Sequence, residues 1–321
     1  MGGAQRSVQE LAASLSARPP EFRCSAVTPD APPVIDLSAP GCGERVTEAA
    51  REWGLFQVVN HGVPSSVIAE LQRVGRGFFS LPKEERERYA MDRASGRIEG
   101  YGTTLQREAW HDFFFHVVAP PARVDHGVWP RCPDGYREAN EAYSRHVQQL
   151  ARELFEHLSL GLGLDEGAMA DAFGGGDMVF LQKINFYPPC PQPELTLGVL
   201  PHTDMSTLTL LVPNEVPGLQ VFRDGHWYDV KYVPDALIVH IGDQIEASAH
   251  ATLYNGAYKA VLHRTTVSKE KTRMSWPVFV EPPGELVVGP HPRLVTDESP
   301  AKYKAKKYKE YQHGKINVIP L

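Results

Sequence analysis

The second half of the chain alternates short apolar runs with turn-forming residues. Between Met178 and Val288, runs rich in Val, Ile, Leu, Phe and Thr are separated by Pro, Gly, Asn and Asp. These runs predict strands at 179–187, 206–212, 218–222, 226–230, 236–241, 257–266 and 273–281. Many short strands at this spacing are typical of a β-sandwich or jelly roll, so we expect a mainly β fold with additional helices.

Helical periodicity marks much of the first half. Apolar residues recur every three or four positions at 8–15, 46–53, 67–78 and 147–158, where we expect helices. Short strands are predicted at 33–37, at 55–60 and in the aromatic run 110–116, with a loop at 98–106. Near the C-terminus, lysines and tyrosines interleave over 302–309, which favours a helix with its lysines in solvent and its tyrosines packed inward.

The predicted elements group into layers of a single unit. No Gly/Ser-rich linker divides the 321 residues, so we expect residues 1–321 to fold together. A helix-rich N-terminal layer is predicted at 1–177, a jelly-roll core at 178–290, and a C-terminal helix and tail at 291–321.

Charge and composition narrow the classes of partner. A formal net charge of −6 and a pI near 6.1 argue against a nucleic-acid or anionic-membrane surface, which needs a clustered basic face. The N-terminus has no apolar signal core, and no apolar run reaches the ~18 residues of a membrane span. Cysteine spacing favours free thiols at Cys24, Cys42, Cys132 and Cys190. We therefore expect a soluble cytoplasmic protein, and we further expect it to be a monomer.

His202 and Asp204 form an H-x-D pattern. Because side chains of a strand alternate between its faces, this spacing puts an imidazole and a carboxylate on one side. His263 follows 59 positions after Asp204 (263 − 204), beyond several predicted strands. Two histidines and a carboxylate compose the facial triad that leaves ferrous iron with open positions, although Zn, Mn or Ni would also accept these ligands. The pattern alone is weak, because the chain has 13 histidines and most histidines bind no metal.

Two predicted strands carry further polar residues on one face each. On the strand at 273–281, one face carries Arg273, Ser275, Phe279 and Glu281. On the strand at 179–187, one face carries Lys183, Asn185 and Tyr187. The planar fork of Arg273 suits a carboxylate ligand, with the hydroxyl of Ser275 beside it. A surface ion pair for Arg273 and a solvent-exposed Lys183 are the simpler alternatives.

The aromatic run and one acidic turn complete the set of candidates. Phe113 and Phe115 share a strand face on which a flat aromatic ligand could stack, whereas Phe114 is expected in the core. Packing of all three phenylalanines in the core is the alternative. Asp243 competes as a carboxylate ligand, but we interpret it as a turn residue or as one that orients a ligand.

These residues occur in the order that is typical of the Fe(II)- and 2-oxoglutarate-dependent dioxygenases of the plant flavonoid type, and the chain resembles that family. The resemblance spans most of the chain and includes 33–37, 53–62, 185–191 and the His202-Thr203-Asp204 triplet. The segments 212–222, 224–227 and 263–267 look most like the flavonol synthase branch, with anthocyanidin synthases as close relatives.

The resemblance implies a double-stranded β-helix core that holds Fe(II) through His202, Asp204 and His263. It implies that 2-oxoglutarate binds to Arg273 and Ser275 with help from Tyr187 and Asn185, and that O2 is the second cosubstrate and ascorbate the reductant. The flavonoid-binding residues that it implies are Lys183, Phe113, Phe115, Phe279 and Glu281. The implied reaction is oxidation of a dihydroflavonol to a flavonol, with release of succinate and carbon dioxide.

The sequence differs from the usual family pattern in two places, and two other functions are possible. Relatives usually carry His or Tyr where this chain has Phe113, and the turn at 247–256, which contains His250, looks about five residues longer than is usual in the family. An anthocyanidin synthase, or a relative that oxidises flavones or flavanones, would share the same iron and cosubstrate residues. A catalytically silent protein that binds a flavonoid or hormone is the alternative from another class.

Overall fold

The computed structural model describes residues 31–92, 97–104, 109–246, 258–289, 292–294 and 304–317. The predicted helix at 8–15 and the turn at 247–256, with His250, lie outside the described residues, as does Cys24.

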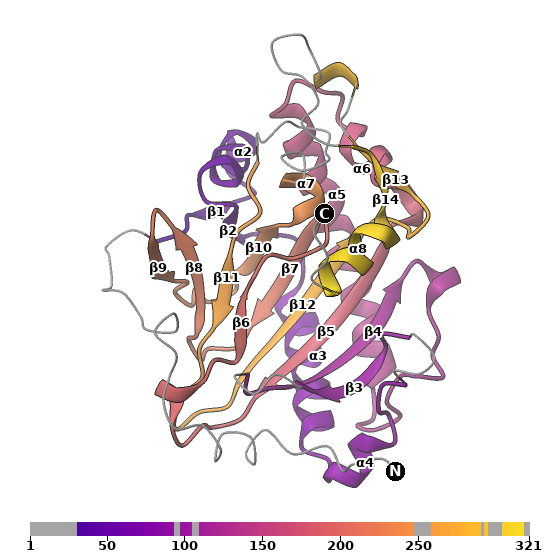
Figure 1. The fold of residues 1–321 in the computed structure, drawn as a ribbon, viewed down its shortest axis with the longest axis vertical. Helices are drawn as coiled ribbons and strands as arrows, with labels where there is room; N and C mark the ends of the chain where they lie inside the picture. Colours follow the sequence, from indigo (N-terminus) through magenta and orange to yellow (C-terminus); the bar gives the residue numbers. More distant parts are fainter. Residues whose placement is uncertain are drawn as a thin grey trace.

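A large sheet of eight strands forms the centre of the molecule (Figure 1). In spatial order its strands are β1 (Val34–Asp36), β2 (Leu55–Val59), β10 (Leu237–Ile241), β7 (Leu208–Pro213), β12 (Arg273–Glu281), β5 (Val179–Tyr187), β4 (Asp112–Ala119) and β3 (Gly100–Thr103). All neighbouring strands pair antiparallel except β1 and β2, which are parallel.

A smaller sheet packs against one face of the large one. Its four strands, in spatial order, are β6 (Val199–His202), β11 (His263–Thr265), β8 (Leu219–Arg223) and β9 (His226–Asp229). A separate apolar cluster lies between the two sheets and includes Leu55, Leu211, Val221 and Ile238. The two facing sheets form the predicted double-stranded β-helix. A two-stranded ribbon, β13 (Val287–Val288) with β14 (Lys306–Lys307), lies outside it.

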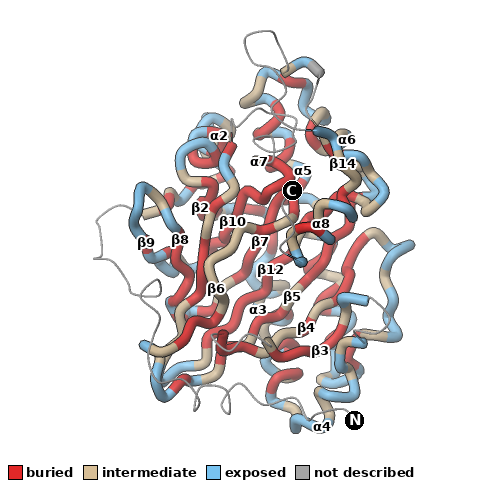
Figure 2. Tube along the Cα trace, viewed as in Figure 1, coloured by how far each residue is buried: buried red, intermediate tan, exposed pale blue. Residues whose placement is uncertain are grey.

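Helices α2 (Cys42–Glu52), α3 (Ser65–Phe79) and α5 (Tyr136–Leu160) cover the opposite face of the large sheet. Further α-helices are α4 (Lys83–Glu87), α6 (Ala168–Ala172), α7 (Asp243–Glu246) and α8 (Tyr308–Ile316). Short 3-10 helices occur at Pro121–Arg123, Gly175–Asp177, Pro193–Leu195 and Pro292–Leu294. In Figure 2 the central strands are buried along nearly their whole length, while the helices show buried and exposed stripes. The main core therefore lies between this sheet and α2, α3 and α5.

Because side chains alternate along β5, one face of this strand packs against the helices and the other faces the smaller sheet. Phe180 and Ile184 belong to the core under the helices, and Gln182 donates to Asn140 on α5 at 2.6 Å. The residues between them face the smaller sheet, as predicted for a strand with one polar and one apolar face. Phe114 on β4 is fully buried in the same core, which confirms the prediction for this residue.

Three sequence predictions about elements were wrong in part. The predicted loop at 98–106 contains β3, because Gly102 lacks a side chain and lets the ring of Phe113 lie against it from β4. Of the predicted strand at 257–266, only His263–Thr265 is a strand in the described part. The predicted helix at 302–309 begins only at Tyr308, and Lys306 and Lys307 pair as β14 instead. Tyr308 is buried as predicted.

Candidate metal centre and active site

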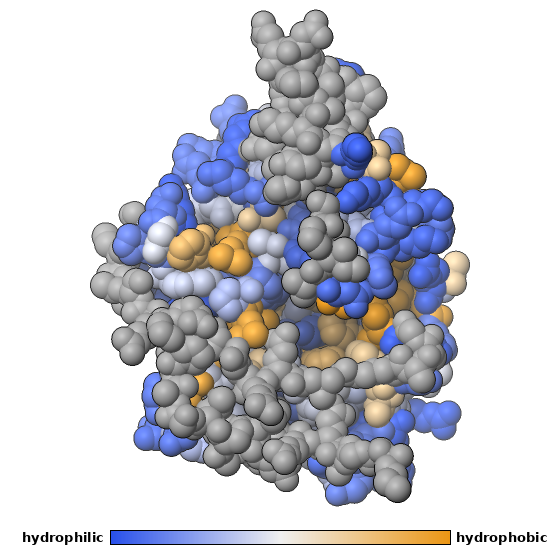
Figure 3. All heavy atoms as spheres, viewed as in Figure 1, coloured by the Kyte–Doolittle hydropathy of each residue, from blue (hydrophilic) through white to orange (hydrophobic). Residues whose placement is uncertain are grey.

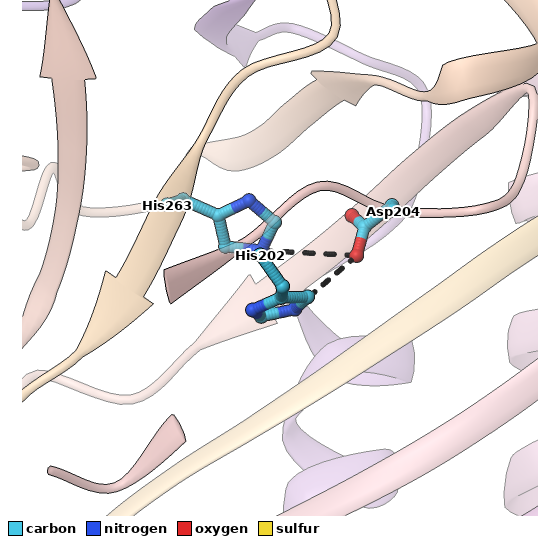
Figure 4. A group of neighbouring side chains, drawn as sticks. All are labelled: His202, Asp204 and His263. Atoms are coloured by element: carbon cyan, nitrogen blue, oxygen red, sulfur yellow. Dashed lines mark ion pairs between the residues drawn. The ribbon is translucent and has the colours of Figure 1, made fainter. Parts of the chain in front are cut away.

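His202, Asp204 and His263 meet between the two sheets. His202 ends β6 and lies directly opposite His263 on β11, and Asp204 follows two residues after His202. Figure 4 shows both imidazoles directed at the same carboxylate. The Nε2 atoms of His202 and His263 lie 3.6 and 3.7 Å from Oδ1 of Asp204. The three candidate ligand atoms lie within 4.8 Å of one another, and these residues form the one such three-residue group in the described ranges.

Both imidazoles are oriented by main-chain carbonyl groups. Nδ1 of His202 bonds to the carbonyl of Leu200 at 2.8 Å, and Nδ1 of His263 bonds to the carbonyl of Val261 at 3.0 Å. A carbonyl oxygen only accepts, so each Nδ1 carries the hydrogen and each Nε2 keeps a free lone pair. The two rings therefore present the nitrogen that a metal ion needs.

Electrostatics favour the ligand forms of all three groups. Burial lowers the pKa of His202 and, more strongly, that of His263, so both rings are neutral near pH 7. Burial opposes ionisation of Asp204, but the surrounding imidazoles, above all His263, overcome it and hold the pKa of this carboxyl below its usual range. A carboxylate between two neutral imidazoles is ready to receive a divalent cation.

The predicted cosubstrate residues gather on the large sheet next to this cluster. Arg273 lies opposite Tyr187 on the neighbouring strand, and Ser275 lies opposite Asn185. The amide of Asn185 donates to the Ser275 hydroxyl at 3.2 Å, and the Arg273 guanidinium lies 5.1 Å from the Tyr187 ring centroid. Arg273 is 2 % exposed, yet its Nε and Nη1 atoms have no hydrogen-bond partner among the described residues. Such an unsatisfied buried guanidinium suits an acidic ligand.

The predicted substrate residues form an aromatic corner beside the cluster. The ammonium group of Lys183 lies 4.9 and 5.1 Å from the ring centroids of Phe113 and Phe115. The ring centroids of Phe115 and Phe279 are 6.3 Å apart. Burial lowers the pKa of Lys183 to about 8. The polar face predicted for β5 therefore lines the interior, and the alternative of a solvent-exposed Lys183 is wrong.

Glu281 lies at the far end of β12, next to the C-terminal helix. Its carboxylate accepts a hydrogen bond of 3.2 Å from Gln312 of α8, and burial raises its pKa to about 7. Tyr311 and Lys315 of the same helix bind Asp243, whose main-chain N–H donates to the Asp204 carbonyl at 2.8 Å. Asp243 thus touches a candidate ligand through its backbone, while its carboxylate anchors α8.

The cavity between these groups measures about 50 Å³. Nine of the twelve predicted site residues line it, and Phe113, Phe115 and Glu281 lie outside its lining. Figure 3 shows apolar side chains gathered in a hollow beside α8, over β4 and β5. A larger hollow of about 650 Å³ lies between Val216, Lys231 and Lys271, away from the histidine cluster.

Three buried polar residues near the cluster were not predicted from the sequence. His111 stacks on Tyr187 with ring centroids 5.4 Å apart, and strand alternation through Phe113 and Phe115 would have placed it on their face. Thr209 and His240 lie opposite each other on β7 and β10 and contact Asp204. The sequence gives no signal for that pair, because their meeting depends on the register between strands that are distant in sequence.

The fold and the site together define a class of protein. A double-stranded β-helix with a His-Asp-His cluster between its two sheets is the arrangement of a metal-dependent oxygenase, and the donor set fits ferrous iron. The unsatisfied Arg273 beside it fits the carboxylate of a cosubstrate.

Comparison with known proteins identifies the family. Residues 178–282 match the 2OG-Fe(II) oxygenase superfamily, and residues 32–133 match the N-terminal region of the non-haem dioxygenase in morphine synthesis. The chain therefore belongs to the 2OG-Fe(II) oxygenase superfamily and is an enzyme of the dioxygenase class, to which Fe(II), 2-oxoglutarate and O2 belong.

Among individual proteins, the chain is 58% identical over 294 residues to flavonol synthase 1 of Crocosmia x crocosmiiflora, covering 90% of this chain and 87% of that protein. It is 56% identical over 298 residues to a flavonol synthase/flavanone 3-hydroxylase of Eustoma exaltatum subsp. russellianum, with the same coverage. The crystal structure of JOX2 in complex with 2OG, Fe and JA superposes with a TM-score of 0.85 at 35% identity, covering 97% of this chain and 93% of that chain. In the described residues, no helix has the length and apolar character to cross a membrane.

Proposed function

We propose that this enzyme oxidises dihydroflavonols to flavonols, with His202, Asp204 and His263 holding Fe(II). The observation that carries the proposal is the His-Asp-His cluster beside an unsatisfied Arg273 and a corner of three phenylalanines. The names and identities of the flavonol synthase relatives support the choice of substrate class. We further infer that the protein works as a cytoplasmic monomer, with ascorbate as reductant.

In this proposal the overall reaction balances with one molecule of each cosubstrate. Fe(II) with O2 and 2-oxoglutarate supplies the two-electron oxidation. A dihydroflavonol, 2-oxoglutarate and O2 give a flavonol, succinate, carbon dioxide and water. Arg273 and Ser275 bind the carboxylate of 2-oxoglutarate that lies away from the metal, since a guanidinium and a hydroxyl can donate to it together. Asn185 orients Ser275 through their hydrogen bond.

The protein's remaining role is to bind and orient the flavonoid. Phe113, Phe115 and Phe279 offer ring faces to the flat substrate, which excludes water from the reacting carbons. Lys183 donates to a phenolic oxygen, and Glu281 accepts from a phenolic hydroxyl at the other end. Because Phe113 cannot form a hydrogen bond, the polar contacts of the substrate fall on Lys183 and Glu281.

Product analysis tests the proposal directly. The purified enzyme is incubated with Fe(II), ascorbate, 2-oxoglutarate and dihydrokaempferol, and the products are identified by mass spectrometry. We expect a product two hydrogens lighter than the substrate, together with an equal amount of succinate. If dihydrokaempferol fails to stimulate carbon dioxide release from labelled 2-oxoglutarate, the assigned substrate is wrong.

A second candidate substrate class follows from the combined name of one relative, flavonol synthase/flavanone 3-hydroxylase. The same assay with a flavanone would then give a product one oxygen heavier than the substrate. A leucoanthocyanidin in the same panel distinguishes the anthocyanidin synthase alternative. A binding protein without catalysis would retain flavonoids but produce no succinate in either the wild type or His202→Ala.

A further inference from the structure

The two oxygens of the Asp204 carboxylate have different surroundings. Oδ1 faces the Nε2 atoms of His202 and His263 at 3.6 and 3.7 Å. Oδ2 points the other way and accepts a hydrogen bond of 2.7 Å from the Thr209 hydroxyl and one of 3.2 Å from Nδ1 of His240. Only Oδ1 is therefore directed at the place where the two histidine nitrogens converge.

The hydrogen positions in this network follow from chemistry. An ionised carboxylate can only accept, so both Thr209 and His240 must be donors to Oδ2. Since Thr209 gives its only hydrogen to Asp204, the 3.1 Å contact between Ser206 and Thr209 must have Ser206 as the donor. All these side chains are buried: Thr209 and His240 are each 1 % exposed. The donors are thus fixed in one arrangement.

The sheet itself aligns the two donors. Thr209 on β7 and His240 on β10 are direct partners in the antiparallel register, so their side chains leave the same face side by side. Asp204 comes from the loop after β6 of the smaller sheet. The His240 ring also stands edge-on to the His263 ring, with centroids 4.5 Å apart. The large sheet therefore contacts both a carboxylate and an imidazole ligand carried by the smaller one.

We propose that Thr209 and His240 are positioning residues that restrict Asp204 to one-oxygen ligation of the metal. With two donors on Oδ2, the carboxylate cannot turn to offer both oxygens without losing two buried hydrogen bonds. One-oxygen ligation leaves an additional position at the metal for the cosubstrate. The inference rests on the proposed function, because it takes His202, Asp204 and His263 as the ligands.

Two matched pairs of variants test it on the metal-loaded protein without turnover. Thr209→Val replaces the hydroxyl by a methyl group and so removes the donor, whereas Thr209→Ser retains a hydroxyl. His240→Phe removes the donor but keeps a ring, whereas His240→Asn can place an amide N–H near the position of Nδ1. Co(II) is the probe: its affinity is measured by calorimetry, and its d–d absorption spectrum reports the ligand number.

We expect Thr209→Val and His240→Phe to weaken Co(II) binding by about 10- to 100-fold, the usual effect of losing a hydrogen bond to a ligand, and to alter the spectrum. Thr209→Ser and His240→Asn should remain within about threefold of the wild type, since each keeps a donor. If His240→Phe does not fold, the Thr209 pair decides alone, because a buried Thr to Val change preserves shape.

Two results overturn the inference. One is wild-type Co(II) affinity and spectrum in the variants that lack a donor. The other is an equal loss in the conservative variants, which would assign the effect to packing. Failure of the proposed substrate is distinguishable, because a wild type that binds Co(II) with this variant pattern but oxidises no flavonoid refutes only the substrate. A wild type that binds no Co(II) refutes both.

Discussion

Arg273 brings a permanent positive charge into the interior without enough protein partners to satisfy it. We predict that Arg273→Lys weakens 2-oxoglutarate binding by about 10- to 100-fold, because a charge-assisted hydrogen bond contributes roughly 1.5–3 kcal/mol and lysine lacks the planar fork. Calorimetric titration of 2-oxoglutarate into the Mn(II)-loaded protein measures this loss.

Arg264 offers a matched control for that prediction. Its guanidinium is also buried, but it donates to Gln220 at 2.8 Å and lies 4.0 Å from the Trp227 ring centroid. Arg264→Lys should therefore lower stability and leave 2-oxoglutarate affinity unchanged. Equal affinities for 2-oxoglutarate in Arg273→Lys and the wild type would contradict the assigned role.

We expect the buried charge of Lys183 to lower the stability of the folded protein and to contribute to substrate binding. Burial lowers its pKa from 10.5 to about 8, so below pH 8 the folded protein bears the full cost of a buried charge. We predict that Lys183→Met raises the free energy of unfolding of the metal-free protein at pH 7 by about 1 to 3 kcal/mol, allowing for partial exposure, while raising the KM for the flavonoid. Urea unfolding measures the first effect and steady-state kinetics the second.

The pH dependence of stability tests whether the charge of Lys183 causes this effect. Between pH 8 and 10.5 the folded wild type loses this proton while the unfolded chain keeps it, so the unfolded state binds more protons and wild-type stability rises. The advantage of Lys183→Met should therefore shrink across that window and vanish above it. An advantage that is constant with pH would point to packing instead of charge.

At the residue scale, the sequence predicted which side chains meet more reliably than how they are held. The H-x-D spacing correctly predicted that His202 and Asp204 meet, but the predicted reason, strand alternation, is wrong, because β6 ends at His202 and Asp204 lies in the loop after it. The carbonyl groups of Leu200 and Val261 that orient the two imidazoles, and the donors Thr209 and His240, depend on loop geometry and strand register. No local pattern encodes those contacts.

Among the elements, α8 lies at the edge of the site, next to Glu281 of β12. A cavity of about 50 Å³ is far below the ~300 Å³ or more of a typical small-molecule site, and Phe113, Phe115 and Glu281 lie outside its lining, so a flavonoid cannot bind inside this cavity alone. Helix α8 is held beside the site by polar contacts to residues outside the lining of that cavity: Gln312 binds Glu281, and Lys315 binds Thr203 and Asp243. Polar contacts near the surface can open at lower cost than the packed core.

We predict that Lys315→Met loosens α8 and perturbs the metal ligands. The lysine donates to the Thr203 carbonyl at 2.9 Å and to its hydroxyl at 2.6 Å, and Thr203 lies between the candidate ligands His202 and Asp204. Hydrogen exchange over residues 304–317 should become faster, and the KM for the flavonoid should change by several fold. Lys309→Met, which breaks a surface contact with Glu285, is the control and should change neither. Unchanged exchange in Lys315→Met would show that Lys315 does not anchor the helix.

Element boundaries were predictable where the pattern was long and regular. The strands predicted at 179–187 and 273–281 coincide with β5 and β12, since nine alternating residues between turns leave little freedom. Short β3 was missed because Gly100 and Gly102 are typical of loops, and it forms only by pairing with β4. The predicted helix at 147–158 is the second half of α5, whose first turns bury tyrosines and polar residues instead of aliphatic ones.

On the scale of the whole molecule, each of the two sheets supplies a different set of site residues. The smaller sheet carries His202 and His263, and the large sheet carries Arg273, Ser275 and Lys183. The helices behind the large sheet fix its position through the main core. The candidate metal site therefore forms only when both sheets are correctly packed, which would link metal binding to folding.

That link predicts a metal-dependent stability. Mn(II), which mimics Fe(II) without oxidation, should raise the free energy of unfolding by about 2.7 kcal/mol at a concentration 100 times its Kd, because the unfolded chain cannot assemble the three ligands. Thermal unfolding with Mn(II) and then with excess chelator measures the gain and its reversal. His202→Ala should fold normally, since its side chain is 39 % exposed, and should lose the gain. A stabilisation by Mn(II) that persists in His202→Ala would mean that the ion binds elsewhere, and the assignment of the metal to the His202–Asp204–His263 cluster would be refuted.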